Sequence, residues 1–333
     1  EQHPKSASLL LSCAQLLVSI HRPQKALHYL NLAESLEPFN IDLYYTKANV
    51  FSQLRKSGKA LENYRKALVY ADSKEKEDIF LQMAFENENR SRYDLAIALL
   101  KEVLELNPEN ETAIYEIGFC YDASESTQKG LEYFTKFVDK TPYSYIGWHN
   151  LGMSYFKLEL YEKAISCFDF SIAIKPDFSS AYFNKAHCLS NMEEYSKAIE
   201  CFKETMEYDA EDSYSYYCIG ECYEKLENYQ KAISYYRKSI DIDDFNADAW
   251  LGIGASYNEL DQLHDAISYV QKAIKLDSQN PEYWFVFGDI QSKLGFYEEA
   301  KMSFENVKKL DPENDEIYSD LGWINEQLGN YGE

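Results

Sequence analysis

Proline, glycine and long apolar runs are scarce in this sequence. Eight Pro and 13 Gly occur among 333 residues, and most of the Pro residues lie between helix-type patterns, which is typical of all-helical proteins. No apolar run reaches the roughly 18 residues that a transmembrane helix needs. The sequence therefore predicts an all-α protein without membrane insertion.

Basic residues are also few, and the formal net charge is −23. Because nucleic-acid binding needs clusters of Lys and Arg, this composition predicts no nucleic-acid partner. The charge is uneven: residues 1–76 carry 11 Lys and Arg against 7 Asp and Glu, a formal +4, so the remainder carries −27. The acidic surface either keeps a long chain soluble or favours partners with basic flanks.

Common signatures of enzymes are missing. The sequence has no phosphate-binding GxxxxGK[ST], no HExxH and no GxSxG motif. Gly252 and Gly254 form G-x-G within a helix-type pattern, not after a strand. We therefore predict a non-enzymatic protein with no catalytic residues and no cofactor.

The seven Cys residues form no metal-binding pattern. Cys218 and Cys222 have i, i+4 spacing, but no nearby His or third Cys completes a zinc set, so no metal site is predicted. An odd number of thiols favours a reducing compartment, and we expect a cytoplasmic protein. A secreted or lipid-anchored form stays open, because residues 9–20, LLLSCAQLLVSI, could serve as a secretory core.

One pattern recurs along almost the whole chain at a step of 34 residues. A small residue returns at one phase, at Gly118, Gly152, Ala186, Gly220, Gly254, Gly288 and Gly322. A second small residue returns at Ala164, Ala198, Ala232, Ala266 and Ala300. Two helices can pass closely where such residues meet, and a fixed period of this size indicates a solenoid.

The best copies of the pattern are WHNLGMSY at 148–155, WLGIGASY at 250–257 and YEKAISCFDFSIAIKP at 161–176. They resemble the tetratricopeptide repeat family, whose unit has W-x2-L-G-x2-Y followed by Ala, an aromatic residue and Pro. The resemblance implies an all-α, right-handed superhelical α-solenoid of stacked antiparallel helix pairs. It also places residues 9–20 in the first repeat helix, since Ala26 follows Ala14 by the same interval as in other units.

We predict a single array over residues 1–333. Nine full units start at residues 7, 41, 77, 111, 145, 179, 213, 247 and 281, and a half unit covers 315–333. The unit at 41 is two residues longer than the others, and we expect the extra residues in a charged loop from Asp72 to Lys76. The half unit lacks a partner helix, which makes it a candidate surface for self-association.

The resemblance implies that ligands bind a concave groove lined by the first helix of each unit. Four successive units have an apolar residue or His at a groove position that is usually polar: Phe85, Phe119, Met153 and His187. The complete set of predicted groove residues is Phe85, Phe119, His149, Asn150, Met153, Phe156, Phe183, Asn184, His187 and Glu221.

Two types of polar contact are predicted in this groove. Asn150 and Asn184 could bond an extended peptide backbone, because a carboxamide both donates and accepts hydrogen bonds. Nearby carboxylates would suit Lys or Arg on either side of an apolar anchor; they are Glu88, Asp122, Glu221 and Glu224. The alternative is that the aromatic residues pack against adjacent helices and form core.

The sequence thus predicts a protein- or peptide-binding scaffold that takes an extended segment with apolar anchors and basic flanks. The alternative is the regulatory or substrate-recruiting repeat segment of a larger enzyme or signalling protein. Related arrays that clamp a carboxylate end use Lys at the fifth position of a unit. Here that position has no Lys, which argues against that mode.

Overall fold

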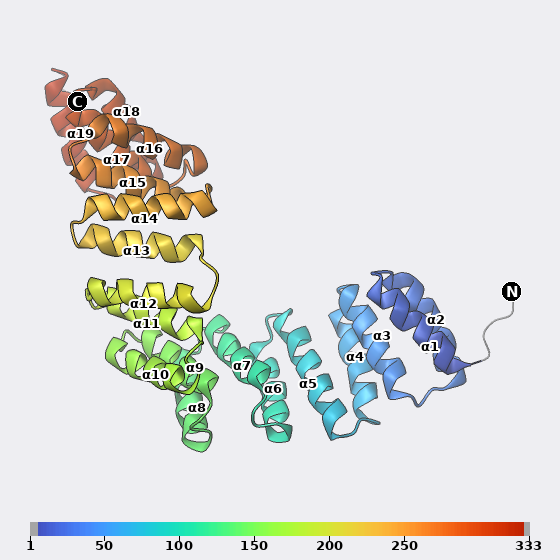
Figure 1. The fold of residues 1–333 in the computed structure, drawn as a ribbon. Coiled ribbons are helices and arrows are strands. Elements are labelled where there is room, and N and C mark those ends of the chain that lie inside the picture. Colours follow the sequence, from blue (N-terminus) through green and yellow to red (C-terminus); the bar gives the residue numbers. More distant parts are fainter. Residues whose placement is uncertain (1–5, 330–333) are drawn as a thin grey trace. The chain divides into compact units, whose positions relative to one another are not determined.

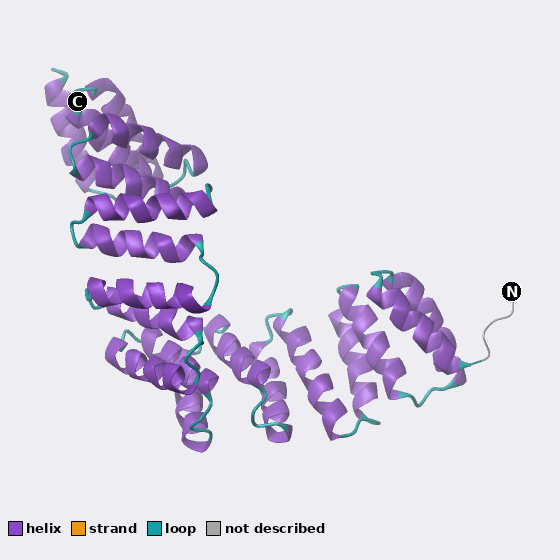
Figure 2. Ribbon diagram, in the orientation of Figure 1, coloured by secondary structure: helices purple, strands orange, loops and turns teal. Residues whose placement is uncertain are grey.

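The computed structural model describes residues 6–329, and within this range all regular structure is α-helical (Figure 2). This confirms the predicted all-α solenoid class. The helices are α1 (Ala7–Ser19), α2 (Pro23–Leu36), α3 (Ile41–Gln53), α4 (Ser57–Leu68), α5 (Ser73–Glu88), α6 (Tyr93–Leu106), α7 (Glu111–Ala123), α8 (Thr127–Lys140), α9 (Tyr145–Lys157), α10 (Tyr161–Ile174), α11 (Ser179–Asn191), α12 (Tyr195–Tyr208), α13 (Ser213–Lys225), α14 (Tyr229–Ile242), α15 (Ala247–Glu259), α16 (Leu263–Leu276), α17 (Pro281–Lys293), α18 (Tyr297–Leu310) and α19 (Glu316–Gln327).

The chain divides into two compact units, Glu1–Leu160 and Tyr161–Glu333. The first unit contains α1–α9 and the second contains α10–α19. Inside each unit, consecutive helices form closely packed pairs, such as α3 with α4 and α13 with α14 (Figure 1). We describe each unit by itself, and one continuous array over both stays a prediction.

Close helix contacts occur at the small residues of the repeat. A Cβ added to Gly254 in α15 would lie 2.4 Å from the Cγ2 of Val270 in α16. A Cβ added to Gly220 would lie 2.6 Å from the ring of Tyr236, and one added to Gly252 would lie 2.5 Å from the same ring. Tyr236 therefore fills a slot that only glycine leaves open on both sides, and it is 1% exposed.

Several helices that open a repeat unit, such as α3 and α7, begin at a side-chain cap, and the cap of α5 corrects a prediction. Asp72 accepts a hydrogen bond from the backbone N–H of Glu75, while the Glu75 carboxylate accepts one from the N–H of Asp72. This capping box stabilises a helix start four residues before the expected residue 77. The predicted charged loop at Asp72–Lys76 is therefore wrong, since residues 73–76 form the first turn of α5, which has 16 residues.

Both ends of the described chain follow the repeat pattern. Leu10 and Ala14 of α1 pack in one core cluster with Ala26 and Leu30 of α2, as the repeat register predicted for residues 9–20. At the other end, α19 is packed through Ile317 and Ile324, in a cluster with Phe304 of α18. Two aromatic residues of α19 remain about half exposed, Tyr318 at 48% and Trp323 at 47%. Self-association through this surface stays a prediction.

The turn inside each repeat has one residue with positive φ. The eight non-glycine examples are His21, Arg55, Ser91, Glu125, Glu159, Glu193, Glu227 and Asp261, and the glycines are Gly295 and Gly329. At Glu227 (φ 56°), the next N–H, that of Asn228, donates to the carbonyl of Tyr223 at 2.8 Å, which closes the end of α13. Left-handed backbone costs an L-residue about 1 kcal/mol.

We expect Glu227→Gly to raise the free energy of unfolding by up to about 1 kcal/mol, because glycine adopts positive φ without the Cβ clash. Gly295→Ala, at the equivalent turn with φ 79°, should lower it by a similar amount. Chemical denaturation followed by circular dichroism measures both. A loss of stability in Glu227→Gly would show that the turn has no such strain.

Candidate functional site

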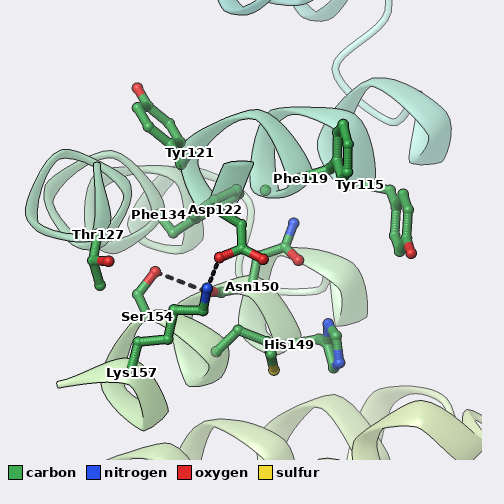
Figure 3. Close-up of a pocket in the computed structure, with 12 residues that line it drawn as sticks. Tyr115, Phe119, Tyr121, Asp122, Thr127, Phe134, His149, Asn150, Ser154 and Lys157 are labelled. Carbon is green, nitrogen blue, oxygen red and sulfur yellow. Dashed lines mark hydrogen bonds and ion pairs between the residues drawn. The ribbon is translucent and has the colours of Figure 1, made fainter. Parts of the chain in front are cut away.

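A pocket of about 150 Å³ lies among α7, α8 and α9 in the first unit, and we call it the anchor pocket (Figure 3). Its walls are mainly apolar. The lining residues are Tyr115, Gly118, Phe119, Tyr121, Asp122, Thr127, Phe134, His149, Asn150, Met153, Ser154 and Lys157. Four predicted groove residues are therefore brought together in one pocket: Phe119, His149, Asn150 and Met153.

A single contact between α7 and α9 determines how the pocket is built. A Cβ on Gly118 would lie 2.6 Å from Nδ2 of Asn150, so only glycine lets Asn150 cross to α7. There, Nδ2 of Asn150 donates to the backbone carbonyl of Ile114 at 2.9 Å. Asn150 is 6% exposed. Its carboxamide thus ties the two first helices together at the base of the pocket.

The predicted peptide contact of the two Asn residues is limited by these internal bonds. Nδ2 of Asn184 in the second unit donates to the carbonyl of Ser180 at 2.9 Å. Each carboxamide therefore already uses one N–H within the chain. Binding of a peptide backbone by Asn150 and Asn184 stays a prediction.

Phe119 and Met153 form the apolar part of the pocket wall, one from each of the neighbouring first helices. The side chain of Phe119 is 47% exposed, and Met153 is half-buried. Tyr115, one helical turn before Phe119 on α7, is also exposed. These rings differ from core rings such as Phe134, which is 1% exposed. Phe119 is therefore not a core residue, although its ring also contacts that of Tyr93 on α6 edge-to-face, with the centroids 6.4 Å apart.

His149 lines the pocket and is otherwise buried, with 7% of its surface exposed. Burial lowers the pKa of His149 to about 4, and a hydrogen bond with Asn150 opposes this shift. The imidazole is therefore neutral near pH 7. It contributes shape and hydrogen bonding to the pocket, and no charge.

Two predicted groove residues of the first unit lie outside the pocket lining. Phe85 on α5 and Phe156 on α9 are both half-buried.

Asp122, one of the carboxylates expected to receive a basic partner residue, forms an ion pair with Lys157 at the rim of the pocket (Figure 3). Its charge is therefore already compensated within the chain.

Two carboxylates of neighbouring units, Glu88 at the end of α5 and Glu116 in α7, lie close enough for the charge of Glu116 to affect Glu88. Oε1 of Glu88 accepts a weak hydrogen bond from Sγ of Cys120 at 3.5 Å. Burial, reinforced by the nearby charge of Glu116, raises the pKa of Glu88 to about 7, and burial also raises the pKa of Glu116. Glu116 precedes Phe119 by three residues, so both share one face of α7. A nearby positive charge would stabilise the ionised forms of Glu88 and Glu116 and lower both pKa values.

The remaining predicted groove residues lie in the second unit and form a separate group. The ring of Phe183 is 4.6 Å from that of His187, and His187 is 5.1 Å from Phe202, measured between ring centroids. Phe183 and His187 are half-buried, and burial lowers the pKa of His187. The rings of Phe183 and His187 therefore pack against each other and against Phe202 of α12, as the core alternative expects of aromatic residues at these positions.

Glu221, also in the second unit, is exposed but is not free of internal contacts. Its Oε1 accepts a hydrogen bond from the hydroxyl of Tyr217 at 2.9 Å. The nearby Glu224 accepts one from the hydroxyl of Tyr236 at 2.8 Å. The pKa of each carboxyl is raised, mainly because neighbouring side chains keep water away.

The sequence reasoning missed several residues of the anchor pocket. The sequence identified Gly118 only as a small residue at which helices pack closely. In the structure, Asn150 of α9, in the next unit, lies against Gly118 of α7. Ser154 bonds the carbonyl of Asn150 at 3.0 Å, and Lys157 reaches Asp122 at the rim. A search for Gly in one unit followed by Asn in the next could have indicated this notch.

Neither a metal centre nor a membrane span is found in residues 6–329. No group of three His, Cys, Asp or Glu side chains in that range could hold a metal ion. The Cys residues are free, and all except Cys13 are buried. No helix in the same range is long and apolar enough to cross a membrane.

Two family models match the chain, and both describe the tetratricopeptide repeat. One matches residues 145–178 and 213–246. The other matches residues 41–71, 179–212, 247–280 and 281–314. Neither model describes a catalytic domain. No curated protein matches the sequence.

Solved structures show the same fold. The crystal structure of the APC/C hetero-tetramer Cut9-Hcn1 aligns with 98% of this chain and 78% of its own, at 17% identity and a TM-score of 0.54. A tetratricopeptide repeat protein from Parabacteroides merdae aligns with 75% of this chain and 98% of its own, at 14% identity and a TM-score of 0.54.

The repeat period, the paired helices with glycine at their closest approach, and the family models that match most of the chain all agree. Arrays of this kind present binding surfaces to other proteins, and that is the function class to which the fold points. The chain belongs to the tetratricopeptide repeat family.

Proposed function

We propose that the face formed by α7 and α9 binds an extended peptide segment and takes one of its apolar side chains into the anchor pocket. The observation that carries this proposal is a preformed, mainly apolar pocket of about 150 Å³ beside two exposed rings, Tyr115 and Phe119. An apolar cavity of roughly 150 Å³ can hold a benzene ring. The pocket therefore suits a Leu, Met or Phe side chain.

Exposed apolar surface next to a pocket is a common feature of partner sites. Tyr115 is 54% exposed and Phe119 47%, although both lie on a helix that also supplies core residues. Burying one large apolar side chain contributes about 1.5–3 kcal/mol. A single anchor thus supplies about tenfold to a hundredfold in affinity, which is typical of a selective but reversible contact.

The carboxylate pair Glu88 and Glu116 determines which residues flank the anchor in this proposal. A Lys or Arg on the peptide would contact the pair and stabilise both ionised forms. Asp122 is less suited, because Lys157 already pairs with it. The preference for basic flanks therefore rests on Glu88 and Glu116.

The second unit supplies a further contact region in this proposal. It comprises Phe183, Asn184, His187 and Glu221, beside Tyr214, which is 52% exposed. The rings of His187 and Tyr214 are stacked, with centroids 6.0 Å apart and an angle of 29° between the planes. Stacked rings next to a carboxylate suit aromatic or basic side chains.

To test the anchor pocket, a random peptide library displayed on phage is selected against the whole protein. We expect selected peptides to share one Leu, Met or Phe. Met153→Glu and Phe119→Glu should each weaken their binding about tenfold or more, because a carboxylate in the pocket opposes burial of the anchor. Isothermal titration calorimetry with one synthetic selected peptide measures the loss.

Phe39→Glu is the matched control, because Phe39 is 76% exposed, lies in the same unit and is far from the pocket lining. Circular dichroism confirms that the variants keep their helices. The site assignment is wrong if Met153→Glu and Phe119→Glu bind the peptide as tightly as Phe39→Glu does.

The basic-flank preference has its own pH signature. The raised pKa of Glu88, about 7 in the folded protein, means that its carboxyl is protonated in acid and charged above neutrality. A selected peptide with Lys beside its anchor should bind several-fold more tightly at about pH 8 than at about pH 5.5. The same peptide with Ala in place of Lys should show little change. Equal pH dependence of the two peptides would exclude Glu88 and Glu116 as the flank site.

A further inference from the structure

A second cavity of about 860 Å³ lies in the first unit, between the turn that joins α3 to α4 and the end of α5. We call it the basic cavity. It shares no lining residue with the anchor pocket. It is also of opposite character, since its walls are polar and carry several positive charges.

Four cationic side chains line the basic cavity: Arg55, Lys56, Lys59 and Arg90. All four are exposed, and none has a carboxylate partner within the part of the chain that the structure describes. Other cations of this unit do have one, for example Lys47 with Glu34 and Lys66 with Glu62. In a chain of net charge −23, four cations without a carboxylate partner around one cavity create a local positive potential, although Lys59 also lies over the ring of Phe51, 5.6 Å from its centroid.

The N-terminus of α4 opens into the same cavity. Lys56 is the N-cap of this 12-residue helix and makes no side-chain cap hydrogen bond. A Cβ placed on Gly58, in the first turn, would meet no atom within 4 Å. The N–H of Lys59 already donates to the carbonyl of Lys56 at 2.9 Å. The positive end of the α4 dipole adds to the positive potential of the Lys and Arg side chains.

Glu86 of α5 is the unexpected member of the cavity lining. Its equivalents in the other units are all neutral: Leu16, Val50, Cys120, Ser154, Cys188, Cys222, Ser256, Ile290 and Ile324. Glu86 is only 3% exposed, and its Oε2 has no hydrogen-bond partner among residues 6–329. The nearby hydroxyl of Tyr64 donates instead to Oδ1 of Asn49, at 2.6 Å.

A buried carboxylate oxygen without a donor is costly for the folded chain. A neutral residue at this phase avoids burying a charge, although the buried hydroxyl of Ser256, at the same phase of another unit, also has no hydrogen-bond partner in residues 6–329. A ligand that brings both negative charge for the cations and an N–H or O–H donor for Glu86 would satisfy all groups of the cavity together.

We propose that the basic cavity binds an acidic peptide segment of a protein partner. Its carboxylates contact Arg55, Lys56, Lys59 and Arg90, and its main-chain N–H groups donate to Glu86. A peptide has an N–H at nearly every residue, whereas a phosphodiester link has none, so Glu86 selects a peptide over a nucleic-acid backbone. This site is independent of the anchor pocket and has the opposite charge preference.

The test uses fluorescein-labelled hexa-aspartate as the probe and fluorescence anisotropy on the whole protein at low ionic strength. We expect saturable binding that weakens with added salt. Lys56→Glu with Lys59→Glu should weaken binding about tenfold or more. Arg65→Glu with Lys74→Glu is the matched control, because it changes net charge equally at exposed positions outside the cavity, and it should change binding less than about twofold. Arg90→Gln tests the other wall independently.

Glu86→Val distinguishes a ligand contact from a purely structural residue. Because Val50 occupies the same phase in the preceding unit, this variant should fold and gain thermal stability. It should nonetheless bind hexa-aspartate about fivefold more weakly. It should also lose the preference of the native protein for hexa-aspartate over its N-methylated form, which lacks main-chain donors.

Three results would overturn the proposal. They are no saturable binding of hexa-aspartate to the native protein, equal losses in the cavity and control double variants, and equal or tighter binding by Glu86→Val. Labelled hexathymidylate carries comparable negative charge without main-chain N–H groups. If it binds as tightly as hexa-aspartate, the site reads charge alone and the assignment to a peptide is wrong.

Discussion

The structure depends on how closely neighbouring helices approach at the small residues of each repeat. Gly220 and Gly252 leave a slot for Tyr236, and Gly254 admits Val270 against its backbone. The same constraint at Gly118 lets Asn150 cross between two first helices and bond the carbonyl of Ile114. In that place the close approach holds the helices together and forms the base of a pocket. The contact between Gly118 and Asn150 therefore both packs α7 against α9 and shapes the anchor pocket.

In the two proposals, the charges on the first unit give the anchor pocket and the basic cavity opposite ligand preferences. Beside the anchor pocket, burial and the charge of Glu116 raise the pKa of Glu88, while burial alone raises the pKa of Glu116. At the basic cavity, four cations surround Glu86, whose buried oxygen has no donor in the described chain. In both places a carboxylate has no positively charged side chain of residues 6–329 as its partner. Such uncompensated groups are more common at functional sites than in ordinary surfaces.

The fold was predictable because periodicity is a property of the sequence itself. The predicted starts at 7, 41, 111 and 145 are the first residues of helices, whereas α5 begins four residues before the predicted unit start at 77, because a capping box at Asp72 adds a turn. The site was predictable only in part. Phe119 and Met153 share a phase, but the burial of Asn150 depends on Gly118 in another unit. Glu86 is the one charged residue at a repeat position that is neutral in every other unit. The repeat pattern alone does not explain why a charge occurs there.

The central claim is that an apolar peptide side chain occupies the pocket between α7 and α9. The chain has only five Met residues, so 13C-methyl methionine NMR during titration with a selected peptide observes the pocket directly. The account predicts a large shift of the Met153 ε-methyl resonance and no shift of Met302, an exposed residue of α18. A Met153 resonance that stays unchanged when the protein is saturated with peptide would contradict it.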